Sequence, residues 1–163
     1  MKFRDTGGGT VSSRLKQAAV ILVVAFAAAQ LVRPDRANPA TDINRTIQAQ
    51  MGTASGLVPV LDRACRDCHS NGTVWPWYTQ VAPLSWLMAY GVRAGRQAVN
   101  FSDWAGYPPE RQRELLAESC RDVSAGKMPG AYSRLRPETR LSPQDVATIC
   151  AAARQAGPDT SSP

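Results

Sequence analysis

The residues with the clearest chemical potential lie together in Cys65-Arg66-Asp67-Cys68-His69. This stretch has the form C-x-x-C-H, the attachment motif of a c-type haem. On a helical turn, positions i, i+3 and i+4 share one face, so two thiols and an imidazole can point at one flat ligand. The spacing predicts that Cys65 and Cys68 form thioethers with one haem. It also predicts that His69, the single histidine of the chain, binds the iron from the proximal side.

Two other kinds of site use closely spaced cysteines. A thioredoxin-like dithiol belongs in a βαβ context, which this sequence lacks. A zinc-stabilised interaction module could join Cys65 and Cys68 to Cys120 and Cys150, or to His69. Neither Cys120 nor Cys150 lies in a second closely spaced ligand pair, and a four-cysteine site leaves the histidine unexplained. Zinc is therefore the weaker interpretation of the motif.

Cys120 and Cys150 remain once two cysteines are assigned to haem. They could form a disulfide, which would indicate an oxidising compartment. A helical cysteine is also often a small buried hydrophobic residue. The sequence leaves both possibilities open.

The second iron ligand must be a different residue type, because one chain with one histidine cannot supply two. Methionine is the usual partner in cytochromes c. Met128 lies in the loop Gly126–Gly130, between two breakers, where a side chain can be presented to a flat ligand. We expect Met128 to be the distal ligand, and the alternatives are Met88, Lys127 or an open iron site.

The N-terminal segment carries much of the positive charge of the chain, which totals +6. Up to Arg36 there are 6 basic and 2 acidic residues, which argues against nucleic-acid binding by the remainder. Arg14 and Lys16 precede the uncharged, mostly apolar stretch 17–32, the pattern of a signal peptide or signal anchor. We expect a retained anchor, with 27–29 as the alternative cleavage site. The basic flank stays inside, so the rest of the chain is exported.

The chain is predicted to have five parts. These are a disordered cytoplasmic tail (1–13), the signal anchor or signal peptide (14–33), a linker (34–56), a c-type haem-binding domain (57–156) and a polar tail (157–163). Apolar residues at helical spacing predict helices over 57–69, 83–96 and 109–124 and a last helix after Ser142; 40–56 indicates a linker or a marginal helix. No strand pattern is present, so the expected fold is all-α. The aromatic stretch 75–78 suits either a wall beside a haem or ordinary core.

These features together resemble the haem-binding domain family of bacterial single-haem, cytochrome c-like proteins. The resemblance is carried by 33–36, 65–71, Trp75-Pro76-Trp77-Tyr78, 82–86, 100–104, Lys127-Met128-Pro129 and 141–142. It implies a small helical domain wrapped around one covalent haem c, attached through Cys65 and Cys68 and ligated by His69 and Met128. It also implies an N-terminal inner-membrane anchor with the haem domain in the periplasm. Family members often have Met-Pro-Pro where this chain has Gly130, and His-Pro where it has Arg136-Pro137, so no alternative histidine ligand exists here.

Electron transfer is the function that these expectations favour, because the site has no spare acid or base constellation. The expected partners are periplasmic or inner-membrane redox proteins. The alternative is a haem enzyme or a gas or redox sensor with an open, peroxidase-like iron site. Such a site needs a distal donor or base, and only Arg136 or Tyr132 could serve.

Overall fold

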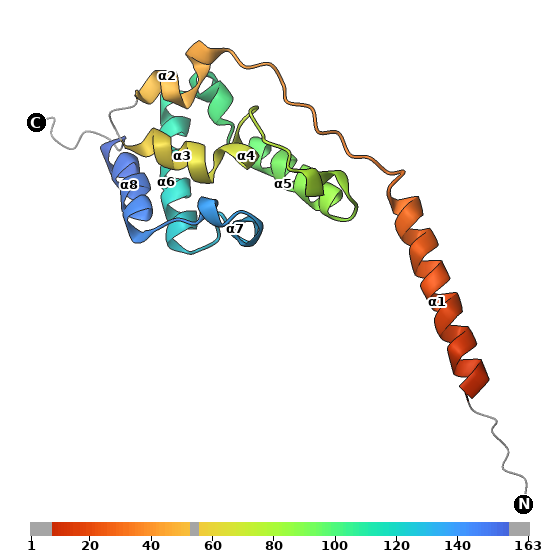
Figure 1. The fold of residues 1–163 in the computed structure, drawn as a ribbon. Coiled ribbons are helices and arrows are strands. Elements are labelled where there is room, and N and C mark those ends of the chain that lie inside the picture. Colours follow the sequence, from red (N-terminus) through yellow and green to blue (C-terminus); the bar gives the residue numbers. More distant parts are fainter. Residues whose placement is uncertain (1–7, 53–55, 157–163) are drawn as a thin grey trace, which may run out of the picture. The chain divides into compact units, whose positions relative to one another are not determined.

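The fold is known from a computed structural model that describes residues 8–52 and 56–156 (Figure 1). Within those residues the chain forms helices and irregular segments and no strand, which confirms the all-α prediction. Contacts divide the chain into two units, residues 1–36 with 75–89 and residues 37–74 with 90–163. The predicted polar tail, 157–163, lies outside the described residues, as do residues 1–7.

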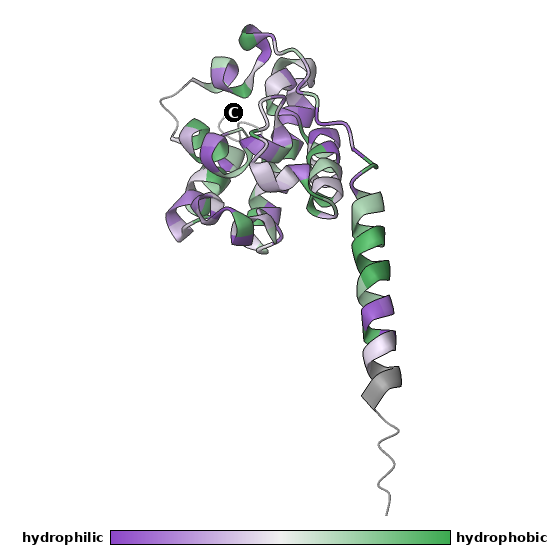
Figure 2. Cartoon of the chain, turned by 45° about the vertical axis from the view of Figure 1, so that its right-hand side comes forward, coloured by the Kyte–Doolittle hydropathy of each residue, from purple (hydrophilic) through white to green (hydrophobic). Residues whose placement is uncertain are grey.

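The first unit contains the apolar helix α1 (Gly8–Ala29). By length and composition, its stretch Ser12–Ala29 is apolar enough to cross a membrane, and Figure 2 shows the run of hydrophobic residues in its second half. The helix begins at Gly8, so residues 8–13 are helical where the sequence predicted a disordered tail. Extending a helix costs little once it is nucleated, because each added residue brings one hydrogen bond.

The first unit also contains 75–89, with the short 3-10 helix η3 (Trp77–Gln80) and the start of α5 (Leu84–Ala98). The span of α5 agrees with the helix predicted over 83–96. Met88 is buried on this helix. Trp77, in contrast, is 79% exposed, so it is not the ordinary core residue that was one of the two roles considered for it.

The second unit holds most of the helical elements. They are η1 (Ile43–Arg45), α2 (Ile47–Met51), α3 (Leu57–Ala64), α4 (Arg66–His69), η4 (Phe101–Gly106), α6 (Pro109–Ser124), α7 (Tyr132–Leu135), η5 (Pro137–Thr139) and α8 (Pro143–Gln155), with the second half of α5. Helices α6 and α8 pack against each other and against α3.

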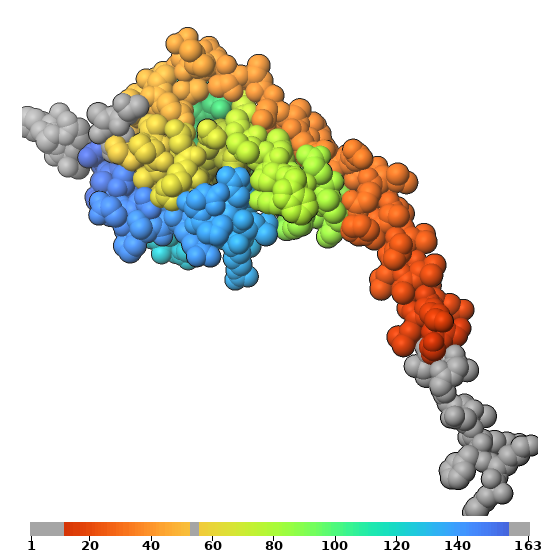
Figure 3. Space-filling view, in the orientation of Figure 1, coloured from red at the N-terminus to blue at the C-terminus, as the bar shows by residue number. Residues whose placement is uncertain are grey.

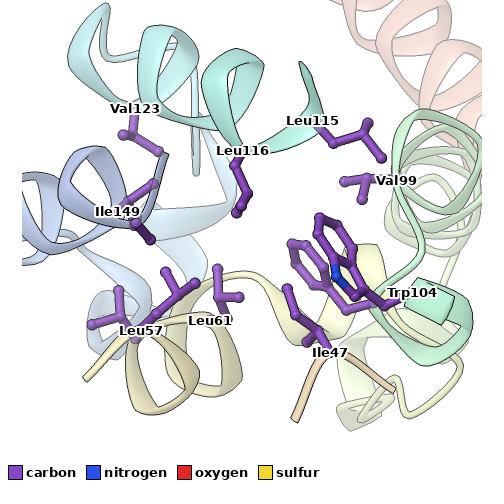
Figure 4. Packing of buried hydrophobic residues seen from close by; sticks show 12 residues of the cluster. Ile47, Leu57, Leu61, Val99, Trp104, Leu115, Leu116, Val123 and Ile149 are labelled. Atoms are coloured by element: carbon purple, nitrogen blue, oxygen red, sulfur yellow. The ribbon is translucent and has the colours of Figure 1, made fainter. Parts of the chain in front are cut away.

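One apolar core holds the second unit together (Figure 4). Leu57 and Leu61 of α3, Leu115 and Leu116 of α6 and Ile149 of α8 meet there. The core also contains Trp104 and the fully buried Ile47. Ile47 belongs to the stretch predicted as a linker or a marginal helix, and the structure shows a short helix, α2, that contributes to the core.

The last two long helices begin and end as their sequences indicate. Helix α6 starts at Pro109 and ends before Gly126, whose φ of +68° is the left-handed conformation that glycine adopts easily. Helix α8 starts with a capping box between Ser142 and Asp145. The backbone N–H of Ser142, its hydroxyl and the guanidinium of Arg63 all lower the pKa of the Asp145 carboxyl. The Arg63 guanidinium lies 2.7 Å from that carboxyl and so connects α3 to the start of α8.

A disulfide between Cys120 and Cys150 joins α6 to α8 across 30 residues of sequence. This decides between the two possibilities that the sequence left open for these cysteines. Since both thiols are consumed, neither can complete a four-cysteine zinc site with Cys65 and Cys68, which are free.

Candidate functional site

The C-x-x-C-H motif forms a single turn at the end of α3. Cys65 ends α3 and begins α4, and its φ of −122° interrupts the continuous helix predicted over 57–69. The N–H groups of Cys68 and His69 both donate to the Cys65 carbonyl, at 3.2 and 3.0 Å. The motif is therefore a separate helical turn, and one backbone carbonyl closes it.

The His69 ring is fixed by its backbone partner. Its Nδ1 lies 3.2 Å from the carbonyl oxygen of Val99. A carbonyl can only accept, so Nδ1 carries the proton, and Nε2 keeps its lone pair. The ring of Phe101 lies 5.9 Å away, centroid to centroid. Burial lowers the pKa of His69, so the imidazole is neutral and its Nε2 is a competent metal ligand.

The two free thiols are half-buried on the same turn. Burial raises the pKa of Cys65 to about 12 and that of Cys68 to about 11, with a further contribution from neighbouring groups. Both side chains are thus neutral thiols at physiological pH. They are not prepared as thiolate metal ligands or as redox nucleophiles, which require the ionised form.

Helix α5 approaches the motif with no side chain between the two backbones. A Cβ placed on Gly95 would lie 2.4 Å from the carbonyl oxygen of Cys68. Only glycine permits this approach. Gly95 also accepts from the N–H of Val99 at 2.9 Å. The end of α5 therefore positions the Val99 carbonyl that orients His69.

A cavity in the second unit adjoins the motif. Its volume is about 110 Å³, and about 610 Å³ when the space between its walls out to solvent is included. The enclosed 110 Å³ is smaller than the ~300–1,000 Å³ range of pockets for organic ligands, so a large ligand would also occupy the open side of this cavity. The lining residues are mostly apolar: Leu61, Cys65, His69, Ala98, Val99, Phe101, Leu115, Glu118, Ser119, Asp122, Val123, Met128 and Ile149.

Met128 reaches this cavity from the loop after α6. The backbone N–H groups of Lys127 and Met128 both point at the Asp122 carbonyl, at 2.9 and 3.4 Å, so the loop folds back on the helix end. Met128 is 45% exposed. The ammonium of Lys127 pairs with the Asp122 carboxylate instead. Among the alternatives considered for the second ligand, neither Lys127 nor Met88 lines the cavity.

Asp67, between the two cysteines, is a hydrogen-bonding centre that the sequence did not indicate. One of its carboxylate oxygens accepts from the N–H of Val74 at 3.1 Å. The other accepts from the hydroxyl of Tyr132 at 2.8 Å and lies 3.4 Å from the guanidinium of Arg136. In Figure 3 the segment that carries α7 lies beside the motif segment. An acid inside the motif was the available signal, but its two side-chain partners, Tyr132 and Arg136, are more than 60 residues away.

The donor set and lining suit a flat, largely apolar group that carries a metal. Two neutral thiols and one imidazole lie on a single turn, a thioether side chain faces the same cavity as the imidazole, and most of the wall is apolar. Among the described residues no group of three or more His, Cys, Asp or Glu side chains is arranged to hold a bare metal ion. A metal at this site would therefore need further ligands from a bound group.

Comparison with known proteins agrees with this interpretation. No curated protein and no solved structure matches the chain. A family model described as a haem-binding domain matches residues 24–155, which is most of the chain and includes the motif, the cavity and the Met128 loop. The cofactor that the site suits is thus the one the family binds, and the chain belongs to the haem-binding domain family.

Proposed function

We propose that this protein is a membrane-anchored c-type cytochrome that carries one covalent haem and transfers single electrons in the periplasm. Cys65 and Cys68 hold the haem, His69 is the proximal iron ligand and Met128 the distal one. The observation that carries the proposal is that His69, Cys65 and Met128 line one cavity and that the Val99 carbonyl leaves Nε2 of His69 free.

Attachment needs no external oxidant or reductant. Each thiol would add across one vinyl group of the haem, with the sulfur bonding to one carbon, the thiol proton going to the other and the C=C bond becoming single. Both thiols are protonated, as this addition requires overall. Because both are half-buried and Gly95 lies against the backbone of Cys68, we expect attachment to precede the final packing of α5 on the motif.

A bound haem supplies one-electron redox chemistry, and the protein sets how readily it occurs. The Val99 carbonyl accepts from His69, which fixes the ring and increases the basicity of Nε2. A methionine ligand raises the reduction potential. If His69 and Met128 both hold the iron, it would not be open to small ligands, which favours electron transfer over catalysis.

The open-site alternative has less support. It needs Tyr132 or Arg136 as a distal donor, and both are engaged with Asp67. Neither is among the residues that line the cavity.

Membrane attachment and export are supported by two separate features. Helix α1 is apolar enough to span a bilayer, and its basic residues Arg14 and Lys16 precede the apolar run, which places the rest of the chain outside. The Cys120–Cys150 disulfide fits an oxidising compartment such as the periplasm.

A ligand-replacement experiment tests the assignment. The ferric wild type should be low-spin with a methionine-to-iron charge-transfer band, and Met128→Ala should lose this band. Met88→Leu is the matched control, because Met88 is buried outside the cavity. Persistence of the band in Met128→Ala would contradict the distal assignment, and a high-spin wild type would favour the open site.

The covalent link is tested separately. A pyridine haemochrome spectrum and the intact mass of exported protein should report one haem per chain, and the pigment should stay with the protein in acidified solvent. Cys65→Ser and Cys68→Ser should each reduce the number of thioethers by one. Pigment that extracts freely from the wild type would overturn covalent attachment.

A further inference from the structure

The uncharged stretch 75–87 exposes large apolar side chains. Trp77 is 79% exposed, Leu87 63%, Trp86 38% and Val81 36%. No Asp, Glu, Lys or Arg occurs between Trp75 and Leu87. A run of exposed aromatic and aliphatic side chains without charge is unusual on a surface that faces only water.

This stretch is hydrogen-bonded to the residues that follow the apolar helix. The Gln30 side chain accepts from the N–H of Ala82 at 2.9 Å and approaches its carbonyl at 3.5 Å. The indole N–H of Trp86 donates to the Val32 carbonyl at 2.8 Å. These contacts all lie within the first unit.

A third contact involves Arg36, the last residue of the first segment of this unit. The Arg36 guanidinium donates to the Thr79 carbonyl at 2.9 Å. Residues 30–36 are therefore bound at three points to the stretch that carries the exposed tryptophans.

The length of α1 fixes the depth of these contacts in a bilayer. The 18 residues of Ser12–Ala29 extend about 27 Å at 1.5 Å per residue, close to the ~30 Å thickness of a hydrocarbon core. The chain from Gln30 onward then leaves the hydrocarbon core and enters the headgroup layer, which is roughly 5–7 Å deep on each side. A stretch bonded directly to these residues lies at the same level.

We propose that the exposed apolar side chains of 75–87 rest in the interface of the same bilayer that α1 crosses, on its periplasmic side. The proposal rests on the anchor assigned above. Tryptophan is suited to this layer because its ring is apolar and its N–H is polar, and here the N–H of Trp86 is already satisfied by Val32. Arg33, which is exposed and lies between these contact residues in the sequence, suits a lipid phosphate.

Photolabelling of the full-length holoprotein in nanodiscs tests this surface. The probe is a phosphatidylcholine with a diazirine on the acyl carbons next to the glycerol, and adducts are mapped by mass spectrometry. We expect adducts on α1 and on the peptide that carries 77–87, and few on the exposed surface of α6. The double variant Trp77→Gln/Leu87→Gln should lower labelling of its own peptide several-fold.

The matched control is Leu135→Gln, which changes an exposed leucine of the second unit and should leave labelling unchanged. The labelling of a variant is compared with that of the wild type only if the two have the same haem spectrum. If a variant does not fold, the wild-type labelling map alone tests the surface. Labelled α1 with unlabelled 77–87 would overturn the interfacial surface and leave the anchor in place. Labelled 77–87 without α1 would support the surface and refute the anchor, and no labelling of either would refute both.

Discussion

Gly95→Ala should be the most damaging small substitution near the motif. Its new Cβ would lie 2.4 Å from the Cys68 carbonyl oxygen and 2.9 Å from the carbonyl carbon, and ordinary contact begins at 3.4 Å. Either α5 or the motif turn must therefore shift by about 1 Å. Both obstructing atoms are backbone, so no side-chain rotation can relieve the overlap.

The expected magnitude follows from two opposing effects. Replacing a helical glycine with alanine stabilises a helix by up to about 1 kcal/mol. Overpacking that forces a backbone shift costs about 1–3 kcal/mol, and this site belongs at the upper end because the neighbour is rigid. The net loss in the free energy of unfolding is then about 2 kcal/mol.

Gly91→Ala is the matched control, four residues earlier on the same helix. Nothing lies within 4 Å of the Cβ it would add, so only the helix propensity acts and the protein should gain up to about 1 kcal/mol. The two variants should therefore differ by about 3 kcal/mol. Denaturation of the holoproteins, followed by visible circular dichroism of the haem, measures this difference.

The same pair of variants examines the orientation of His69. The Gly95 carbonyl accepts from Val99, and the Val99 carbonyl accepts from His69. A shift of α5 should thus alter the haem spectrum of Gly95→Ala and leave that of Gly91→Ala unchanged. Equal stability and identical spectra for the two variants would refute the close approach of α5 to the motif.

Three further predictions concern contacts around the site. Tyr132→Phe removes the hydroxyl that donates to Asp67, and a hydrogen bond to a charged group contributes about 1.5–3 kcal/mol. Urea denaturation should show a loss of this order in the free energy of unfolding. No loss would mean that water replaces the hydroxyl. Replacing Cys120 and Cys150 together by serine should cost about 2–4 kcal/mol, and an unchanged melting temperature would argue against the disulfide. The pKa of Asp145 in the folded protein lies below its usual 3.8, so the ionised carboxylate makes the wild type more stable than Asp145→Asn at higher pH. This difference in the free energy of unfolding should vanish as the pH falls through the folded pKa. A difference that does not change with pH would contradict the lowered pKa of Asp145.

The features that the sequence predicted well depend on short separations. The spacing of Cys65, Cys68 and His69 is a property of five residues, and the structure keeps them on one turn. The cap of α8 is likewise set by Ser142 and Asp145, three residues apart. In both cases the interacting groups are close enough in sequence for residue type and spacing to define the local conformation.

The features that the sequence could not predict depend on distant partners. The break at Cys65 follows no local helix breaker, and it lies where the turn meets α5. Tyr132 and Asp67 are 65 residues apart, and no pattern in a single sequence connects them. Ile47 lies in a short segment with weak periodicity, and only the tertiary packing of the core shows that it is fully buried there.

The two sides of the cavity differ in how firmly they are held, and this difference has a functional consequence. On the His69 side the turn is closed by a backbone carbonyl, packed against Gly95 and oriented by Val99. On the other side Met128 depends on a loop whose N–H groups share one carbonyl, and nearly half of its side chain is exposed. Segments with few buried contacts open most easily. Exchange of ligands and access of redox partners should therefore take place on the Met128 side, while the imidazole keeps its position.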